Sequence, residues 1–274
     1  MVRISRFMLG CIVMSCSFSV LAQQPPAQQP VAQPPRVDDS TPSVEVPPPP
    51  VNATVEELER QGDVLRGEKA YLDSVDYYRA AMKKADTAVL HNKAGISYFQ
   101  LYRDRDAKQE YVQALKLDKS YAEAYNNLGA LYYRVQRYGP AVREYRKAIS
   151  ISETNASFHS NLGTAFFSQK NYSAATREYA RAMELDPTVF EHQTSGGVAI
   201  RMISSNDMGH FHYVMAQMYG HREDQQHCRY YLTKANEEGY PIRDALHDGE
   251  FATLRKDPDF VAFVRSLKPP PTTE

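Results

Sequence analysis

The sequence lacks tryptophan, has only three cysteines and carries almost no net charge. Lys plus Arg total 32 against 33 Asp plus Glu, so there is no basic excess of the kind that binds nucleic acid or an anionic membrane. Cys11 and Cys16 lie near the N-terminus, in a stretch that we expect to be removed, which leaves Cys228. One thiol cannot form an internal disulfide, so packing alone must stabilise the fold.

The first 22 residues are typical of a secretory signal peptide. Arg3 and Arg6 precede an apolar run over residues 7–21, and the sequence Val-Leu-Ala ends the segment at Ala22. The run is too short and too interrupted to predict a membrane span. We therefore expect export, to the periplasm of a bacterium, with cleavage after Ala22.

A second interpretation concerns Cys16. The sequence Val-Met-Ser-Cys that ends there resembles a bacterial lipoprotein cleavage box, in which the cysteine becomes a lipid-carrying first residue. The apolar stretch before it is short for that purpose and methionine fits the box poorly, so the secretory signal is favoured. Only lipidation of Cys16 would bring the protein to a membrane, and the mass of the mature N-terminus distinguishes the two.

Residues 23–50 form a Pro/Gln-rich segment with ten of the chain's 17 prolines. Proline removes backbone donors and favours extended conformations, so this composition cannot build a core. We expect a disordered linker that spans up to about 90 Å when fully extended. A plain spacer is favoured over a ligand for a proline-binding module, and the proline-containing tail over 268–274 is expected to be disordered as well.

Three consecutive stretches of 34 residues, beginning at Ala88, Ala122 and Ala156, share residue types at matched positions. Position 11 is aromatic, positions 20 and 27 are alanine and position 24 is tyrosine in all three. Position 8 is always glycine, namely Gly95, Gly129 and Gly163. So many matched positions are typical of a structural repeat. Looser units precede and follow these three, around Gly62 and Ala216.

Each unit has the pattern of two amphipathic helices that cross closely. Small residues leave room where helix backbones approach, and large side chains fill the space beside the crossing. Thr54 and Glu57 form a capping-box pattern at the start of the first helix, and Pro140 suits the first turn of a second helix. Because one unit cannot bury its own apolar face, the units must stack.

The period also divides the chain into segments. Units 1–4 occupy residues 51–187 and are followed by an irregular insertion over residues 188–206. A degenerate unit 5 occupies residues 207–239, and a helical C-terminal cap occupies residues 240–267. Within the insertion, the sequence Ser-Gly-Gly at 195–197 indicates a turn, and the alternation after it weakly indicates an extended segment. The insertion is either a flap over a binding groove or, as we favour, a connector packed on the stack.

The repeated positions resemble the tetratricopeptide repeat (TPR), closely from Ala88 to Pro187 and more loosely in 54–86 and 209–239. The resemblance implies an all-α fold: a right-handed superhelical solenoid of antiparallel helix pairs, about five units long, with a helical cap. Tryptophan, common at position 4 in the family, is replaced in units 2 to 5 by His91, Tyr125, His159 and His212.

In that family the first helices line a concave groove that holds an extended peptide or a partner helix. Asparagine suits a peptide backbone because it both donates and accepts hydrogen bonds, and Tyr133 and Phe167 would add apolar contact. Asn127 and Asn161 either contact such a ligand or bond to the neighbouring helix. The family's groove positions correspond in this chain to Asn92, Lys93, Phe99, Asn126, Asn127, Tyr133, Arg134, Asn161, Thr164 and Phe167.

No motif indicates catalysis, a metal site or a cofactor. His210 and His212 point to different sides of a predicted helix, and Cys228 replaces the alanine of other units as a small buried thiol. We expect a non-enzymatic adaptor or scaffold of the cell envelope that binds a protein or peptide, and neither nucleic acid nor a small-molecule substrate. A second hypothesis is a lipid-anchored envelope assembly component or a self-associating scaffold. A third hypothesis is an enzyme that uses the His-rich unit 5.

Overall fold

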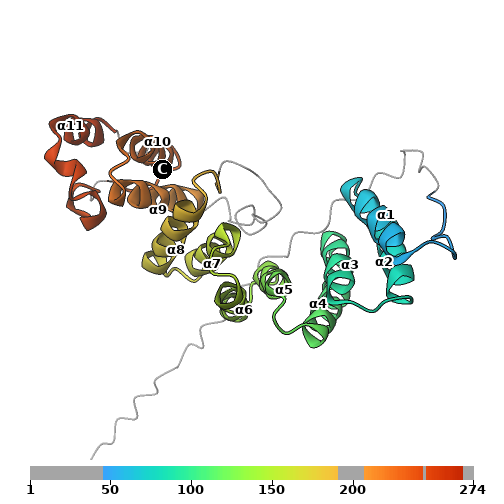
Figure 1. Ribbon diagram of the computed structural model, residues 1–274. Helices are drawn as coiled ribbons and strands as arrows, with labels where there is room; N and C mark the ends of the chain where they lie inside the picture. The colour runs from blue at the N-terminus through green and yellow to red at the C-terminus, as the bar shows by residue number, and fades with distance from the viewer. Residues whose placement is uncertain (1–45, 191–206, 243–244, 268–274) are drawn as a thin grey trace, which may run out of the picture. The chain divides into compact units, whose positions relative to one another are not determined.

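The structure is a computed structural model that describes residues 46–190, 207–242 and 245–267. These ranges belong to one compact unit and contain helices but no strand (Figure 1). The all-α fold expected from the repeat is thereby confirmed. None of the helices within these ranges is long and apolar enough to cross a membrane.

Ten helices of the described chain form five successive pairs, which we call units 1 to 5. The pairs are α1 (Val55–Gly67) with α2 (Tyr71–Met82), α3 (Ala88–Gln100) with α4 (Asp104–Leu117), α5 (Ala122–Arg134) with α6 (Tyr138–Ile151), α7 (Ala156–Ser168) with α8 (Tyr172–Leu185), and α9 (Met208–His221) with α10 (Gln225–Glu237). The capping box predicted before α1 is present, with Thr54 and Glu57 bonded to each other's backbone N–H groups.

A glycine and a tyrosine set the close approach of the two helices in units 1 to 4. A Cβ atom added at Gly129 would lie 2.7 Å from the ring of Tyr145. Gly95 and Gly163 meet the tyrosines of their own units in the same way. These rings are almost completely buried, so the small residue at position 8 is required by the ring that packs on it. Unit 5 has alanine and leucine at the two positions.

The turn between the two helices of a unit is the same in all five. In unit 3 the N–H of Gln136 donates to the Tyr133 carbonyl and the N–H of Arg137 to the Tyr132 carbonyl, which is a Schellman motif. The residue at position 15 has a positive φ of 57–66° in every unit although none is glycine: Lys69, Tyr102, Gln136, Lys170 and Glu223.

Units 1 to 4 stack in one register. At the junction of units 3 and 4, Ala148 near the end of α6 clusters with Phe158 near the start of α7. Between units 1 and 2, Ser74 at the start of α2 shares a 2.7 Å hydrogen bond with Ser97 at the end of α3. Each second helix therefore runs antiparallel to the first helix that follows it.

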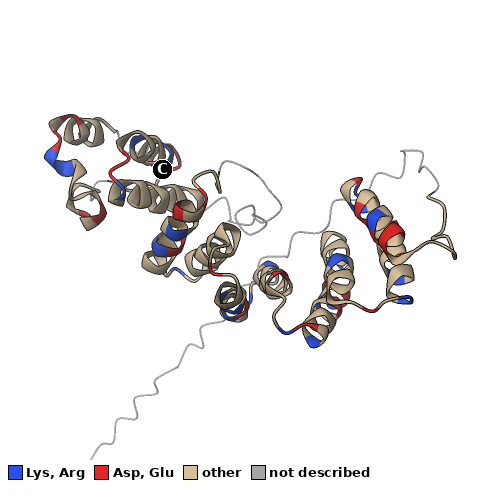
Figure 2. Ribbon diagram, in the orientation of Figure 1, with Lys and Arg blue, Asp and Glu red and all other residues tan. Residues whose placement is uncertain are grey.

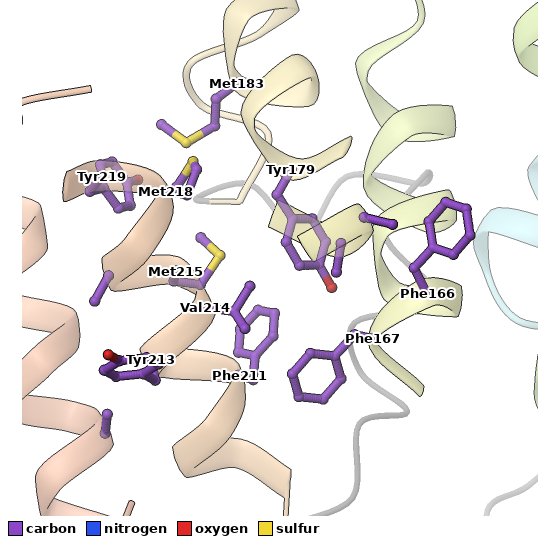
Figure 3. Close-up of a cluster of buried hydrophobic side chains, with 14 of the residues drawn as sticks. Phe166, Phe167, Tyr179, Met183, Phe211, Tyr213, Val214, Met215, Met218 and Tyr219 are labelled. Carbon is purple, nitrogen blue, oxygen red and sulfur yellow. The ribbon is translucent and has the colours of Figure 1, made fainter. Parts of the chain in front are cut away.

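Unit 5 docks in the opposite direction. The ring centroids of Tyr172, which begins α8, and His210, in the first turn of α9, are only 3.6 Å apart. Figure 3 shows the same order along both helices, with Phe211 at one end of the cluster and Met183 and Met218 at the other. Thus α9 runs roughly parallel to α8. A fifth helix pair is present as expected, but its docking differs from that of a continuing repeat.

The longer connection before α9 permits this reversal. A helix of 14 residues such as α8 is about 21 Å long. The 22 residues from 186 to 207 are long enough to return along α8, whereas the short turns of units 1 to 4 are not. At the start of this connection, the Phe190 ring packs on Tyr179 at 5.5 Å between centroids. Residues 191–206, with the expected turn and extended segment, lie outside the described residues.

The end of the proline-rich segment lies against α2. Tyr77 donates a hydrogen bond of 3.0 Å to the Pro47 carbonyl, and Lys84 donates one of 2.9 Å to the Val51 carbonyl. Val46 packs on the apolar cluster of unit 1. The expectation of a linker without contacts is therefore wrong for residues 46–50, because a buried tyrosine provides both an apolar surface and a donor. We call residues 46–51 the strap.

The rest of the expected linker, the expected signal peptide and the tail over 268–274 lie outside the described residues. The cap predicted at 240–267 is helical over the part that the structure describes. Its elements are three short 3-10 helices, η3 (Ala245–His247), η4 (Gly249–Phe251) and η5 (Leu254–Lys256), followed by α11 (Pro258–Ser266). Phe251 and Phe260 are fully buried, and Phe251 packs on Gly220 of α9. The cap therefore covers the last unit.

Candidate partner-binding face

Asparagine side chains connect three successive first helices. The Nδ2 atom of Asn161 donates to Oδ1 of Asn126, and Nδ2 of Asn127 donates to Oδ1 of Asn92, each at 2.9 Å. A longer contact of 3.4 Å joins Asn126 to Asn127. Both short bonds link position 5 of one unit to position 6 of the next. Asn127 and Asn161 thus bond to the neighbouring helix, which is one of the two roles that the sequence left open.

At the first junction a lysine replaces the amide. The Nζ atom of Lys93 lies 2.6 Å from Glu59 and 2.5 Å from Asp63. Burial lowers the pKa of Lys93, but the two carboxylates outweigh burial and raise the pKa overall. The three side chains are 21–34% exposed, so a ligand can reach this charged group from solvent.

Arg134 closes the junction of units 2 and 3. Its guanidinium carbon lies 3.5 Å from the centroid of the Phe99 ring, and the group also bonds to the Phe99 carbonyl and to Asp104. Burial lowers the pKa of Arg134, and the Asp104 carboxylate opposes that effect. The cation and the ring hold each other in place. Arg134 keeps an exposed side-chain fraction of 11%.

The aromatic side chains expected to face a ligand are buried between units. Phe99, Tyr133 and Phe167 are only 6%, 4% and 4% exposed. The Tyr133 hydroxyl shares a 2.7 Å hydrogen bond with Ser168, and Phe167 packs edge-on against Phe211 of α9. The expectation that Tyr133 and Phe167 offer free apolar contact is therefore wrong, because position 12 lies at the contact with the next unit.

The first helix of unit 4 is buried over most of its length. Every residue from Phe158 to Phe167 is buried, including Asn161 and Thr164, and α7 has no Lys, Arg, Asp or Glu (Figure 2). The hydroxyl of Ser160, at position 5, has no hydrogen-bond partner in the described part of the chain. Valine occupies position 6 of unit 5, and the reversed docking moves α9 out of register. The polar connection of the first helices therefore ends at unit 4.

The accessible part of the predicted site lies on units 1 to 3. Of the ten predicted residues, only Lys93, Asn127 and Arg134 are partly exposed. The sequence-based prediction missed Glu59 and Asp63. These residues occupy positions 5 and 9 of unit 1, so applying the groove positions of the repeat to unit 1 would have found both. We call the exposed and half-exposed residues on this side of α1, α3 and α5 the open face: Glu59, Asp63, Lys93, Ile96, Gln100, Asn127 and Arg134.

The histidines at position 4 link the two helices of a unit. His91 bonds to Glu110, and Nδ1 of His159 lies 2.8 Å from Glu178. The hydrogen bond with Glu178 raises the pKa of His159 against the opposing effect of burial. In units 2 and 4, a contact between a histidine and a glutamate thus occupies the position where tryptophan is common in the family. Within the described ranges, no group of three or more His, Cys, Asp or Glu side chains could hold a metal ion.

Cys228 is a fully buried free thiol at the alanine position of the unit, as expected. Burial raises the pKa of this thiol to about 12. The thiolate form, which is the nucleophile, is therefore scarce at neutral pH. Its role is to fill space between α9 and α10.

Family models match the centre of the chain. A TPR repeat model matches residues 95–136 and 135–170, and a tetratricopeptide repeat model matches residues 156–189. These ranges include most of unit 2 and all of units 3 and 4, where the sequence period is strict. None of the curated proteins compared with the chain matches it.

Several solved structures are similar to this chain at low sequence identity. One is pilF of Pseudomonas aeruginosa, 17% identical over 77% of this chain and 88% of its own, with a TM-score of 0.50. MamA of Desulfovibrio magneticus RS-1 is 14% identical over 69% of this chain and 97% of its own, with a TM-score of 0.48. YrrB, described as a TPR protein with an unusual peptide-binding site, is 15% identical over 73% of this chain and 90% of its own, with a TM-score of 0.45.

The likeness to pilF, at 17% identity, concerns the fold and says nothing about shared partners. The evidence for the family is the strict period of the sequence, the stacked helix pairs that it produces and the matching repeat models over residues 95–189. This chain is a tetratricopeptide repeat protein.

Proposed function

We propose that this TPR protein is a non-enzymatic adaptor that holds a segment of a partner protein on the open face of units 1 to 3. Stacked helix pairs in general expose an extended surface suited to binding polypeptides, so the fold supports a role in protein interaction. The observation that carries the proposal is the row of partly exposed polar side chains on consecutive first helices, fixed in place by bonds across the unit junctions.

The chemistry of the open face suits an extended peptide. Gln100 is exposed and offers a donor and an acceptor, while Ile96 adds a half-exposed apolar surface. The Lys93 ammonium and the Asn127 amide are already held by their neighbours, so a ligand would not have to immobilise them. Preorganised polar groups of this kind favour binding to a backbone over recognition of one particular side chain.

We also propose that the protein works in the cell envelope after export. The charged, apolar and small-residue order of residues 1–22 supports this location. The intact mass of the mature chain tests it, since cleavage after Ala22 leaves Gln23 as the first residue. A mature chain that begins with a lipid-modified Cys16 would favour the membrane-anchored alternative, and a chain that keeps residues 1–22 would contradict export.

Photocrosslinking in cells tests the open face. A photoreactive amino acid replaces Gln100 of α3 in one full-length variant and Gln226 of α10 in a matched control, both at exposed positions. We expect a discrete crosslinked polypeptide from position 100, identified by mass spectrometry, and none from position 226. Equal crosslinking from the two positions, or none from position 100, would contradict binding on the open face.

A further inference from the structure

A cleft lies between the second helices of units 1 and 2. Its volume is about 560 Å³, which is within the range of ligand sites in proteins. The end of α2, the first turn of α3 and the second half of α4 provide its lining. The open face lies on first helices, and none of its residues lines this cleft. The function proposed above therefore leaves the cleft unused.

Three cationic side chains line the cleft. Arg79 and Lys83 lie one helical turn apart at the end of α2, and Lys116 lies in the last turn of α4. All three are exposed, and none of them takes part in an ion pair among the described residues. The guanidinium of Arg79 lies 5.7 Å from the centroid of the Tyr98 ring, which leaves its charge uncompensated. These three charges are therefore available to an anionic ligand.

The two carboxylates of the cleft are held by one histidine. The Nδ1 atom of His91 lies 2.5 Å from Oε2 of Glu110, and its Nε2 atom lies 2.7 Å from Oδ1 of Asp86. Even with a neutral imidazole, three cations face two carboxylates, so the lining carries a net positive charge. The near-zero net charge of the whole chain conceals this local excess.

The rest of the lining is apolar or uncharged. Met82 and Val112 are half-buried and provide carbon surface. Gln109 and Gln113 lie one turn apart on α4, and each amide offers donors and an acceptor to a peptide backbone. A small inorganic anion would gain little from the carbon surface, whereas an extended peptide can use the charges, the amides and the apolar side chains together.

We propose that this cleft binds an extended acidic segment of a partner protein. Carboxylates of the segment pair with Arg79, Lys83 and Lys116, and its backbone bonds to the amides of α4. An apolar side chain of the segment packs on Met82 and Val112. The cleft and the open face lie on different helices, so the inference does not depend on the proposed adaptor function.

The dimensions of the cleft fit a short peptide. Gln109 and Lys116 are separated by about 10 Å along the axis of α4. An extended chain rises about 3.3 Å per residue, so roughly three residues of a ligand lie beside this part of the helix. Because the cations are exposed, each ion pair contributes little alone and is screened by salt. Affinity should therefore be modest and should fall as the ionic strength rises.

Binding of an acidic peptide to the purified full chain tests the proposal. The probe is a fluorescein-labelled peptide of alternating glutamate and leucine, and fluorescence anisotropy gives its dissociation constant. One variant carries Lys83→Glu with Lys116→Glu, and the matched control carries Lys69→Glu with Lys256→Glu, two exposed lysines outside the cleft. We expect binding to weaken about tenfold or more in the cleft variant and less than about twofold in the control. Similar dissociation constants for the two variants, or no binding to the native protein, would overturn the proposal.

A neutral pair of substitutions separates binding from folding. Thermal unfolding followed by circular dichroism should give the same midpoint for all variants, since the exchanged lysines are exposed and unpaired among the described residues. If the charge reversal lowers the midpoint, Lys83→Gln with Lys116→Gln replaces it. We expect this variant to bind the peptide several-fold more weakly than the native protein, and native affinity in a folded Lys83→Gln, Lys116→Gln protein would overturn the role of the charges.

Three further probes identify the class of ligand. A peptide with serine in place of leucine should bind more weakly, and equal affinity would overturn the role of Met82 and Val112. Inorganic phosphate at constant ionic strength should not displace the peptide, and competition would assign the cleft to small anions. Phosphatidylglycerol vesicles should not sediment the protein. Sedimentation that is lost with Lys83→Glu and Lys116→Glu would assign the cleft to a lipid surface and overturn a peptide ligand.

Discussion

Units 1 to 4 and unit 5 are built from the same helix pair but are connected differently. In the first four units, each second helix runs antiparallel to the next first helix, and polar side chains bond position 5 to position 6 across three junctions. At the junction with unit 5 the helices run parallel and that bond is missing. The residues inside a unit thus determine the pair, whereas the residues between units determine how pairs dock.

The two kinds of junction also differ in composition. Asparagine and charged pairs hold the regular register, because their hydrogen bonds have narrow geometric requirements. Aromatic and methionine side chains, including Met183, Met215 and Met218, fill the junction of α8 and α9 (Figure 3). Methionine adapts to irregular gaps, so this junction tolerates a geometry that the repeat does not supply.

We expect the largest loss of folding stability from a substitution at the junction of units 4 and 5. Replacing Phe167 with alanine removes a ring that is 4% exposed and packs on Phe211 of α9, so we expect a loss of about 3–5 kcal/mol in the free energy of unfolding. Urea denaturation followed by circular dichroism measures it. A loss below about 1 kcal/mol would mean that unit 5 does not pack on α7 as described.

Units 1 to 4 have glycine at position 8, whereas unit 5 has alanine at that position. A methyl group at Gly129 would lie 2.7 Å from the Tyr145 ring, so Gly129→Ala should destabilise by about 1–3 kcal/mol. The matched control is Gly67→Ala, because an added Cβ atom at Gly67 meets nothing within 4 Å. Similar midpoints of urea denaturation for the two variants would argue against the contact of ring and glycine.

Position 5 provides a direct comparison of the two regions. Asn126→Ala removes a buried amide that accepts from Asn161, so we expect a loss of about 1–3 kcal/mol. Ser160→Ala removes a hydroxyl that has no partner in the described residues, so its effect should be close to zero or stabilising. The difference in thermal midpoint between the variants checks this, and a reversed order would contradict the break in the polar connection.

The turn at position 15 is common to both regions, so a change there should act alike on each. Gln136 in unit 3 and Glu223 in unit 5 have φ values of 57° and 61°, which glycine adopts without steric cost. We expect Gln136→Gly and Glu223→Gly each to stabilise by roughly 0.5–1 kcal/mol. Calorimetry measures both, and destabilisation by either variant would contradict the strained turn.

The smallest effect concerns pH. Because the hydrogen bond with Glu178 raises the pKa of native His159, the pair stabilises fully below the unfolded pKa of about 6.5 and loses this contribution as the pH rises through the native value. Stability should therefore fall as the pH rises above about 6.5, and less so in Glu178→Gln. Identical pH dependence of urea unfolding in the two proteins would show that the pair does not couple to folding.

Much of the fold follows from the sequence because its signals are local. The glycine and tyrosine of Gly129 and Tyr145 act inside one helix pair, so their recurrence predicted the pairs. The turn conformation at Tyr102 and Gln136 was not predicted, because residues other than glycine and asparagine give no signal of a positive φ.

The candidate site was harder to predict than the fold. Burial of Tyr133 and Phe167 depends on how the next unit docks, which the residues of one unit do not encode. The reversed docking of α9 follows from a connection that interrupts the period, and a loose match to the repeat did not reveal the direction of the helix. Lys93 remained accessible because the residues around it belong to the regular stack.

Thiol crosslinking tests the reversed docking of unit 5 most directly. Both variants are made in a Cys228→Ala background. The first carries Tyr172→Cys with His210→Cys, because the native rings at these positions lie 3.6 Å apart. The second carries Tyr172→Cys with Arg222→Cys, the pair that a continuing repeat would bring together. With a short thiol-reactive crosslinker, we predict rapid linkage of the first pair and none of the second. Linkage of the Tyr172→Cys and Arg222→Cys pair alone would show that unit 5 continues the regular stack.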